Sequence, residues 1–131
     1  WEAAVDTDAV LGVRRLRHDP IHRLVLTRVV RVLLRFVHGV PYADANVPYK
    51  LVERRWCERL ASVAPASPAV PSILLAMLLA REGAKVVEQV VVHRPRSGGT
   101  GSLKPARLAR FCVRAWRELG AVARSLPSKR S

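Results

Sequence analysis

The 131-residue chain contains few residues of the types that build several common kinds of site. Its two cysteines, Cys57 and Cys112, form no CxxC pair and no Cys/His cluster, so a structural metal site is not expected. Both lie in apolar stretches, and we expect buried thiols in a reducing compartment. Aromatic residues make up 5% of the chain, which disfavours a stacking platform for nucleic acid.

Long apolar runs are also absent. No stretch of about 18–20 uncharged apolar residues occurs, so no transmembrane helix is predicted. The closest segments are 21–40, which contains four arginines, and 69–80, which is too short. No signal peptide is visible, and the chain begins at Trp1 without an initiator methionine, so we expect its natural start to lie upstream.

Acidic residues are scarce, at 10 against 23 lysines and arginines, and the net charge is +13. Such a charge predicts an anionic partner, which can be nucleic acid, an acidic membrane surface or the phosphate groups of a substrate. Composition does not choose among these three. Half of the residues are apolar, which is enough for a folded core.

Hydrophobic periodicity and turn residues predict seven elements in one domain over residues 1–126, followed by a basic tail at 127–131 that we expect to be disordered. Gly39 and Gly83 are predicted to cap helices at their C-termini. The order of elements indicates an α/β fold with a small, incomplete sheet. Strands are predicted at 8–13, near 49–52 and at 85–93, and helices at 21–38, 54–63, 72–82 and 105–126.

The helix predicted at 21–38 separates basic from apolar residues. At 100° per residue its basic side chains fall within an arc of about 140°, and apolar side chains fill the other side. Two interpretations remain open: a surface helix with a solvated basic face, or a helix lying on an anionic membrane. The basic set is Arg23, Arg28, Arg31, Arg35 and His38, and the apolar set is Leu26, Val29, Val30, Leu33, Phe36 and Val37.

Three clusters can carry chemistry. Arg14 begins a basic turn directly after a predicted strand, where α/β folds bind ligands, although an exposed turn explains it equally well. Asp44 lies in a proline-bounded loop, where it can contact an acceptor, act as a general base or simply cap a turn. The third cluster, at 93–102, combines arginines with glycines and favours phosphate binding, but it lacks the Gly-Lys-Ser/Thr ending of a Walker A motif.

In this order, the clusters resemble the family 2 glycosyltransferases of the dolichyl-phosphate mannosyltransferase-like type. Gly12-Val13-Arg14 matches the Gly-x-Arg element that ends a strand in that family, and segment 69–75 resembles the family's approach to its next helix. Three further elements match at Asp44, Asn46, Pro48, Tyr49, Lys50 and Leu51, then at Glu88, Val91, His93 and Arg96, and finally at Gly99 and Ser102. The likeness covers roughly residues 8–125.

The resemblance implies the C-terminal part of a GT-A nucleotide-diphospho-sugar transferase fold. It implies transfer of a sugar from a nucleotide-sugar donor to a polyprenyl phosphate or a glycan, usually with a divalent cation, Mg²⁺ or Mn²⁺. Asp44 would be the catalytic residue, facing the acceptor or the donor sugar. The substrate-binding residues would be Arg14, Asn46, Tyr49, Lys50, His93, Arg94, Arg96, Gly99 and Ser102.

One departure from the family limits these expectations. Its donor-binding strands and its Asp-x-Asp metal motif have no match here, and Asp6-Thr7-Asp8 lies too close to Gly12-Val13-Arg14 to serve as that motif. We therefore assign no metal ligand and expect the chain alone to be inactive. We expect a cytoplasmic protein, peripheral at the membrane, with nucleic acid not among its partners. The alternative is a non-enzymatic basic module that binds nucleic acid or an anionic membrane.

Overall fold

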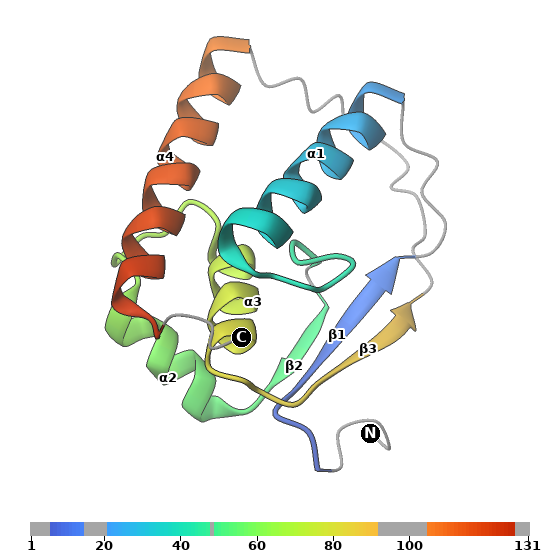
Figure 1. Ribbon diagram of the computed structural model, residues 1–131, viewed down its shortest axis with the longest axis vertical. Coiled ribbons are helices and arrows are strands. Elements are labelled where there is room, and N and C mark those ends of the chain that lie inside the picture. The colour runs from blue at the N-terminus through green and yellow to red at the C-terminus, as the bar shows by residue number, and fades with distance from the viewer. Residues whose placement is uncertain (1–5, 15–20, 48, 92–104, 128–131) are drawn as a thin grey trace.

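The computed structural model describes residues 6–14, 21–47, 49–91 and 105–127, and the side chains of all of these except 14, 21–27, 105 and 106. The predicted α/β class and the order of the seven predicted elements are confirmed (Figure 1). The elements are β1 (Ala9–Arg14), α1 (Ile21–His38), β2 (Lys50–Val52), α2 (Arg54–Val63), α3 (Pro71–Arg81), β3 (Val86–Val91) and α4 (Pro105–Ser125).

The three strands form one mixed sheet in the order β2-β1-β3. β1 pairs antiparallel with β2 and parallel with β3, and Leu11 lies opposite both Lys50 and Glu88. β1 and β3 end opposite each other, at Arg14 and Val91. The antiparallel β2 begins at this same edge, because the backbone N–H of Gly12 donates to the carbonyl of Tyr49 at 2.9 Å.

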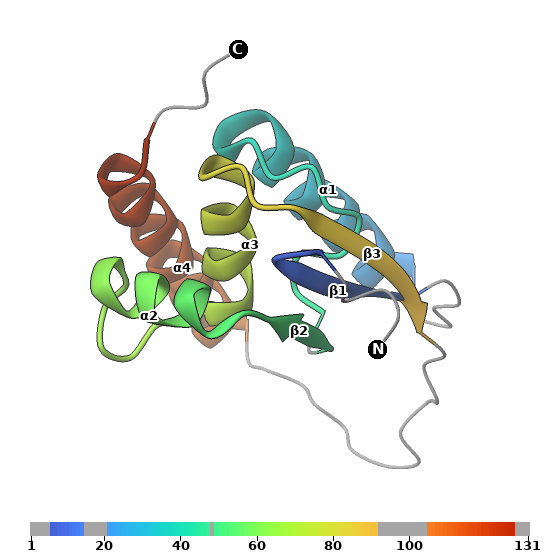
Figure 2. The same ribbon diagram turned by 90° about the horizontal axis from the view of Figure 1, so that it is seen from below.

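The central element of the core is α3, which lies between α4 and the sheet in both views (Figures 1 and 2). Pro71 occupies its first turn, where the missing N–H costs nothing. Gly83 ends it with a φ of 74°, a conformation that glycine adopts without steric cost. The same signal ends α1, where Gly39 has a φ of 69°, so both predicted caps are confirmed. The buried side chains of α3 are Ile73, Leu74, Ala76, Met77, Leu78 and Leu79.

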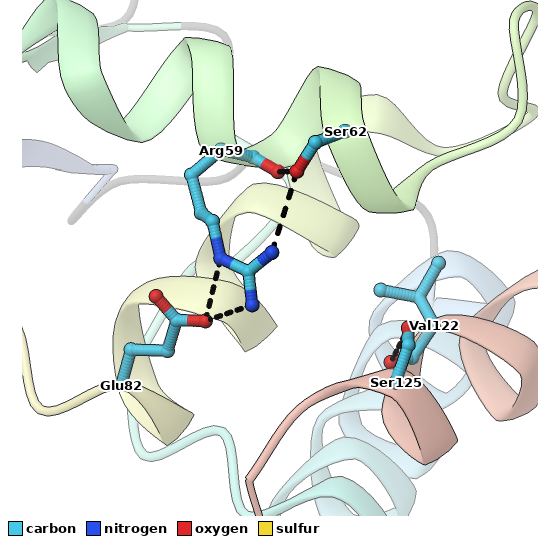
Figure 3. Close-up of polar contacts among 5 residues, drawn as sticks. All are labelled: Arg59, Ser62, Glu82, Val122 and Ser125. Atoms are coloured by element: carbon cyan, nitrogen blue, oxygen red, sulfur yellow. Dashed lines mark hydrogen bonds and ion pairs between the residues drawn. The ribbon is translucent and has the colours of Figure 1, made fainter.

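A pair of charged side chains joins α2 to the end of α3 (Figure 3). The Nε and Nη2 atoms of Arg59 lie 2.9 and 2.8 Å from Oε1 of Glu82, and Nη1 donates to the hydroxyl of Ser62 at 3.3 Å. Figure 3 also shows the last turn of α4, where the hydroxyl of Ser125 donates to the carbonyl of Val122 at 2.9 Å. The first contact holds α2 against the end of α3, and the second lies within the last turn of α4.

One apolar stripe of α4 is buried over its C-terminal half, where Ala115, Leu119, Val122 and Leu126 join the core. Towards the N-terminus of the helix the same stripe leaves the core, and Phe111 and Cys112 are exposed. Cys57 on α2 is exposed as well. The expectation of buried thiols is therefore wrong for both cysteines.

The inner face of α1 differs from the one that its periodicity suggested. Among its described side chains, Leu34 and His38 are buried, although His38 belongs to the predicted basic arc. The broad apolar side instead faces outwards, and Phe36 is 80% exposed. In Figure 1 the N-terminal ends of α1 and α4 extend beyond α3. The exposed apolar residues of α1 are Val29, Val30, Val32, Leu33, Phe36 and Val37.

Candidate functional site

The loop between α1 and β2 carries Asp44 and Asn46, and the sheet holds it from two strands. Lys50 on β2 donates from Nζ to the carbonyls of Ala45 at 2.9 Å and Val47 at 2.7 Å. Glu88 on β3 accepts from the backbone N–H of Ala43 at 2.7 Å. Lys50 and Glu88 flank Leu11 in register, so their side chains share one face of the sheet.

The interior of this loop is apolar, which anchors it against the core. Val47 is fully buried and Ala45 nearly so. The turn closes with a hydrogen bond from the backbone N–H of Val47 to the carbonyl of Asp44 at 3.2 Å. Asp44 is half-buried and Asn46 is exposed on this loop.

The loop forms one wall of a cavity of about 560 Å³. The opposite walls come from α1, from α4 and from residues 69–73 at the start of α3. Of the described lining residues, Arg31 is the basic one and Asp44 the acidic one. Most of the remaining lining is apolar, with Phe111 and Leu34 among it, so the cavity can take a largely apolar ligand that carries an anionic group.

Tyr42 contributes a neutral phenol to this cavity. Burial, together with the nearby carboxylate of Glu88, raises the pKa of Tyr42 to about 12. The group therefore keeps its proton throughout the physiological range and can donate a hydrogen bond to a ligand oxygen. Asn46 and Ser72 supply further polar atoms on the same lining.

The predicted site residues fall into three groups. Asp44 and Asn46 line the cavity, and segment 69–73, part of the stretch that resembles the family, lies beside them. Lys50 supports the loop through its two hydrogen bonds, and Tyr49 is 54% exposed outside the cavity lining. Arg14 ends β1, and its side chain is not among those described. His93, Arg94, Arg96, Gly99 and Ser102 lie outside the described residues.

Topology nevertheless brings the described residues that adjoin the three predicted clusters to one edge of the sheet. Arg14 and Val91 end the parallel strands β1 and β3 there, so the basic turn and the segment that continues to His93 both leave the sheet at this edge. The Asp44–Lys50 loop enters β2 at the same edge. Ligands of α/β folds bind beyond the carboxyl ends of parallel strands, and Arg14 and Val91 lie at such ends.

Sequence reasoning did not single out several residues of the cavity. Arg31 was one of four arginines on its helix, Phe111 had no feature that pointed to a site, and Cys112 was expected to be a buried thiol. Apart from its position two residues before Asp44, Tyr42 had no sequence feature that pointed to a binding site. Finding these residues requires knowing that α1 and α4 line the same cavity. The sequence pattern of each helix does not show which other helix lies beside it.

In the part of the chain that the structure describes, no three histidine, cysteine or acidic side chains gather as a metal site. Asp8, of the rejected Asp6-Thr7-Asp8 element, accepts a hydrogen bond from the backbone N–H of Lys85 at 2.6 Å and pairs with Arg55. Within the described ranges, no helix has the length and apolarity needed to cross a bilayer. Comparison of the chain with models of protein families, with curated proteins and with solved structures finds no match.

Proposed function

We propose that this chain is the C-terminal part of a family 2 glycosyltransferase catalytic domain with a GT-A fold, and that the cavity beside Asp44 receives the acceptor. The observation that carries the proposal is that β1 and β3 end, and β2 begins, at one edge of the sheet. Along the chain, the three sequence clusters adjoin these strand ends at Arg14, Lys50 and Val91. Their order along the chain is the one found in the family that the sequence resembles.

The chemistry of the cavity supports a polyprenyl phosphate as the acceptor. Its apolar lining suits an isoprenoid chain, and Arg31 can neutralise a phosphate through two parallel hydrogen bonds. A phosphate oxygen is already anionic at neutral pH, so it attacks the donor sugar without needing a base. Asp44 then orients the acceptor or the donor sugar. With a glycan hydroxyl as acceptor, Asp44 would instead remove the proton.

Among the described residues, no group of three histidine, cysteine or acidic side chains offers a site for the divalent cation of the family. The part of the reaction that we propose for this chain is acceptor binding and orientation. A cytoplasmic location at the membrane surface, where polyprenyl phosphates are found, belongs to the same proposal.

Acceptor binding can be tested on the chain alone, because the two cysteines form a matched pair of reporters. Both thiols are exposed, Cys112 lines the cavity, and Cys57 lies away from it on α2. Farnesyl phosphate, a short polyprenyl phosphate, should slow alkylation of Cys112 about tenfold at ten times its Kd and leave Cys57 unaffected. Mass spectrometry of the alkylated peptides measures both rates in one sample.

The variant Arg31→Gln should weaken this protection, whereas Arg117→Gln, on α4 outside the cavity lining, should not. Equal rates at Cys112 with and without farnesyl phosphate would refute the acceptor site, and farnesol is the uncharged control. For the complete enzyme, we would sequence the gene upstream of the codon for Trp1. An in-frame extension encoding an Asp-x-Asp element allows a sugar-transfer assay, in which Asp44→Asn should lose activity. A stop codon directly upstream of a genuine start would contradict catalysis.

A further inference from the structure

The outward side of α1 combines a wide apolar face with arginines. At 100° per residue, its six exposed apolar side chains span an arc of about 160°. They follow the helix from Val29 to Val37, a rise of about 12 Å. Arg28, Arg31 and Arg35 occupy the arc beyond Val32, and all three are exposed. Phe36, the most exposed of the large apolar side chains, lies near the middle of the apolar face.

An apolar face of this width is costly to leave in water, since transfer from water stabilises roughly in proportion to the apolar area removed. Described segments of the chain cover Leu34 and His38 on the inner side and do not cover Phe36. A covering partner must therefore come from outside the described part of the molecule. Its chemistry has to match both an apolar face and a positive charge.

We propose that the outward face of α1 docks on an anionic lipid bilayer, with the apolar residues around Phe36 in the interfacial region and the arginines near lipid phosphates. A helix with an apolar face and an arginine-rich polar face binds at the bilayer interface in this manner. The methylene stems of arginine let Arg28 and Arg35 reach the phosphates while the apolar face is inserted. The net charge of +13 adds a long-range attraction to an anionic surface.

Charge and apolarity together favour an anionic bilayer over two other partners, a second copy of the chain and nucleic acid. A second copy of the chain could cover the apolar face, but it would bring another +13 charges against the first, and like charges repel. Nucleic acid would satisfy the arginines and leave Phe36 and Val32 in water. Of these three partners, the anionic bilayer is the one that satisfies both features of α1. The proposal does not depend on the glycosyltransferase activity, although the two are compatible.

The test is flotation of the full chain with vesicles that contain no polyprenyl phosphate. One set is phosphatidylcholine alone, and the other contains about 30% phosphatidylglycerol. We expect binding to the anionic vesicles that decreases with added salt. The double variant Val32→Asn/Phe36→Asn should lower the partition coefficient at least about tenfold, because two large apolar side chains no longer enter the interface. Both positions are exposed, so the fold is retained, and circular dichroism checks this.

Two controls make the test specific. Leu51→Asn removes an exposed apolar side chain from β2 and should leave vesicle binding unchanged. Arg28→Gln/Arg35→Gln should reduce binding about tenfold or more, whereas Arg54→Gln/Arg117→Gln removes the same charge elsewhere and should reduce it much less.

Several results would overturn the proposal. These are absence of binding to anionic vesicles, equal binding to neutral ones, or equal loss with Leu51→Asn. A dimer in light scattering that Phe36→Asn dissolves would assign the face to a second copy. Binding of single-stranded RNA that the Val32 and Phe36 changes leave intact, without vesicle binding, would assign the charge to nucleic acid. Because no acceptor is present, failure here leaves the cysteine-protection result standing.

Discussion

His38 provides the most direct test of how the helices pack. In the part of the chain that the structure describes, it is the one buried polar or charged residue, at 5% exposure, and its two ring nitrogens have no hydrogen-bond partner there. Its ring lies 5.2 Å from that of Trp116 at an interplanar angle of 68°. Burial, with a smaller contribution from the charge of Arg81, lowers the pKa of His38 below its usual value of 6.5.

The consequence is a loss of stability in mild acid. In the unfolded chain the imidazole takes up a proton near its usual pKa, whereas the folded protein resists doing so. The unfolded state therefore binds more protons, and the free energy of unfolding falls as the pH falls. Between pH 7.5 and 5.5 the contribution of His38 reaches at most about 1.4 kcal/mol, the limit for a folded group that stays neutral throughout.

His38→Phe keeps an aromatic ring beside Trp116 and removes both the titration and the unpaired nitrogens. At pH 7.5 we expect a gain of about 1–3 kcal/mol, the usual cost of an unsatisfied buried polar group. The loss of stability between pH 7.5 and 5.5 should shrink by up to about 1.4 kcal/mol. Urea unfolding at the two pH values, followed by tryptophan fluorescence, measures both quantities. Phe36→His is the control, because an imidazole at that exposed site has similar pKa values in both states and adds no pH dependence. An unchanged pH dependence in His38→Phe would refute the packing described for this helix.

Three further substitutions test other contacts, and a fourth is a matched control. Asp8→Asn should lower the free energy of unfolding mainly above pH 4. The pKa of Asp8 is lowered in the folded protein, chiefly by the hydrogen bond from the backbone N–H of Lys85. The carboxylate therefore stabilises the fold above the pKa of the unfolded state, and this stabilisation is lost as the pH falls through the pKa of the folded state, which thermal unfolding over a series of pH values measures. Lys50→Met should destabilise by about 1–3 kcal/mol and speed amide exchange in residues 43–47, because two carbonyls lose their donor. Gly12→Ala should destabilise by about 1–3 kcal/mol, since its new Cβ would lie 3.1 Å from the Cβ of Tyr49, the residue before β2. Gly120→Ala, in open helix surface, should instead stabilise by about 0.5–1 kcal/mol, and chemical denaturation compares the two alanine variants.

The secondary structure was largely predictable because its signals are local. Proline at the first turn of α3 and glycine after α1 and α3 act within a few residues of where they stand, and the structure places these boundaries as predicted. The valine-rich β3 was equally clear. The pairing of β1 with both β2 and β3 was not predicted, since strand order depends on contacts between residues far apart in the chain.

The candidate site was predictable only in part for the same reason. Asp44 and Asn46 were found because their motif is contiguous in the sequence. Lys50 belongs to that motif, yet its ammonium group is engaged by the carbonyls of Ala45 and Val47, an interaction that residue type does not reveal. Arg31 reaches the same cavity from another helix and has no sequence feature that separates it from its neighbours.

The two long helices show why an amphipathic pattern does not by itself locate a core. Periodicity states which residues share a side of a helix, but not what that side contacts. In α4 one stripe passes from a buried half at Leu119 to an exposed half at Phe111, because the helix extends beyond α3. In α1 the narrow side with Leu34 is buried and the broad side with Phe36 is exposed. A broad apolar arc therefore does not identify what covers it, and for α1 the partner that we propose, an anionic bilayer, lies outside the described fold.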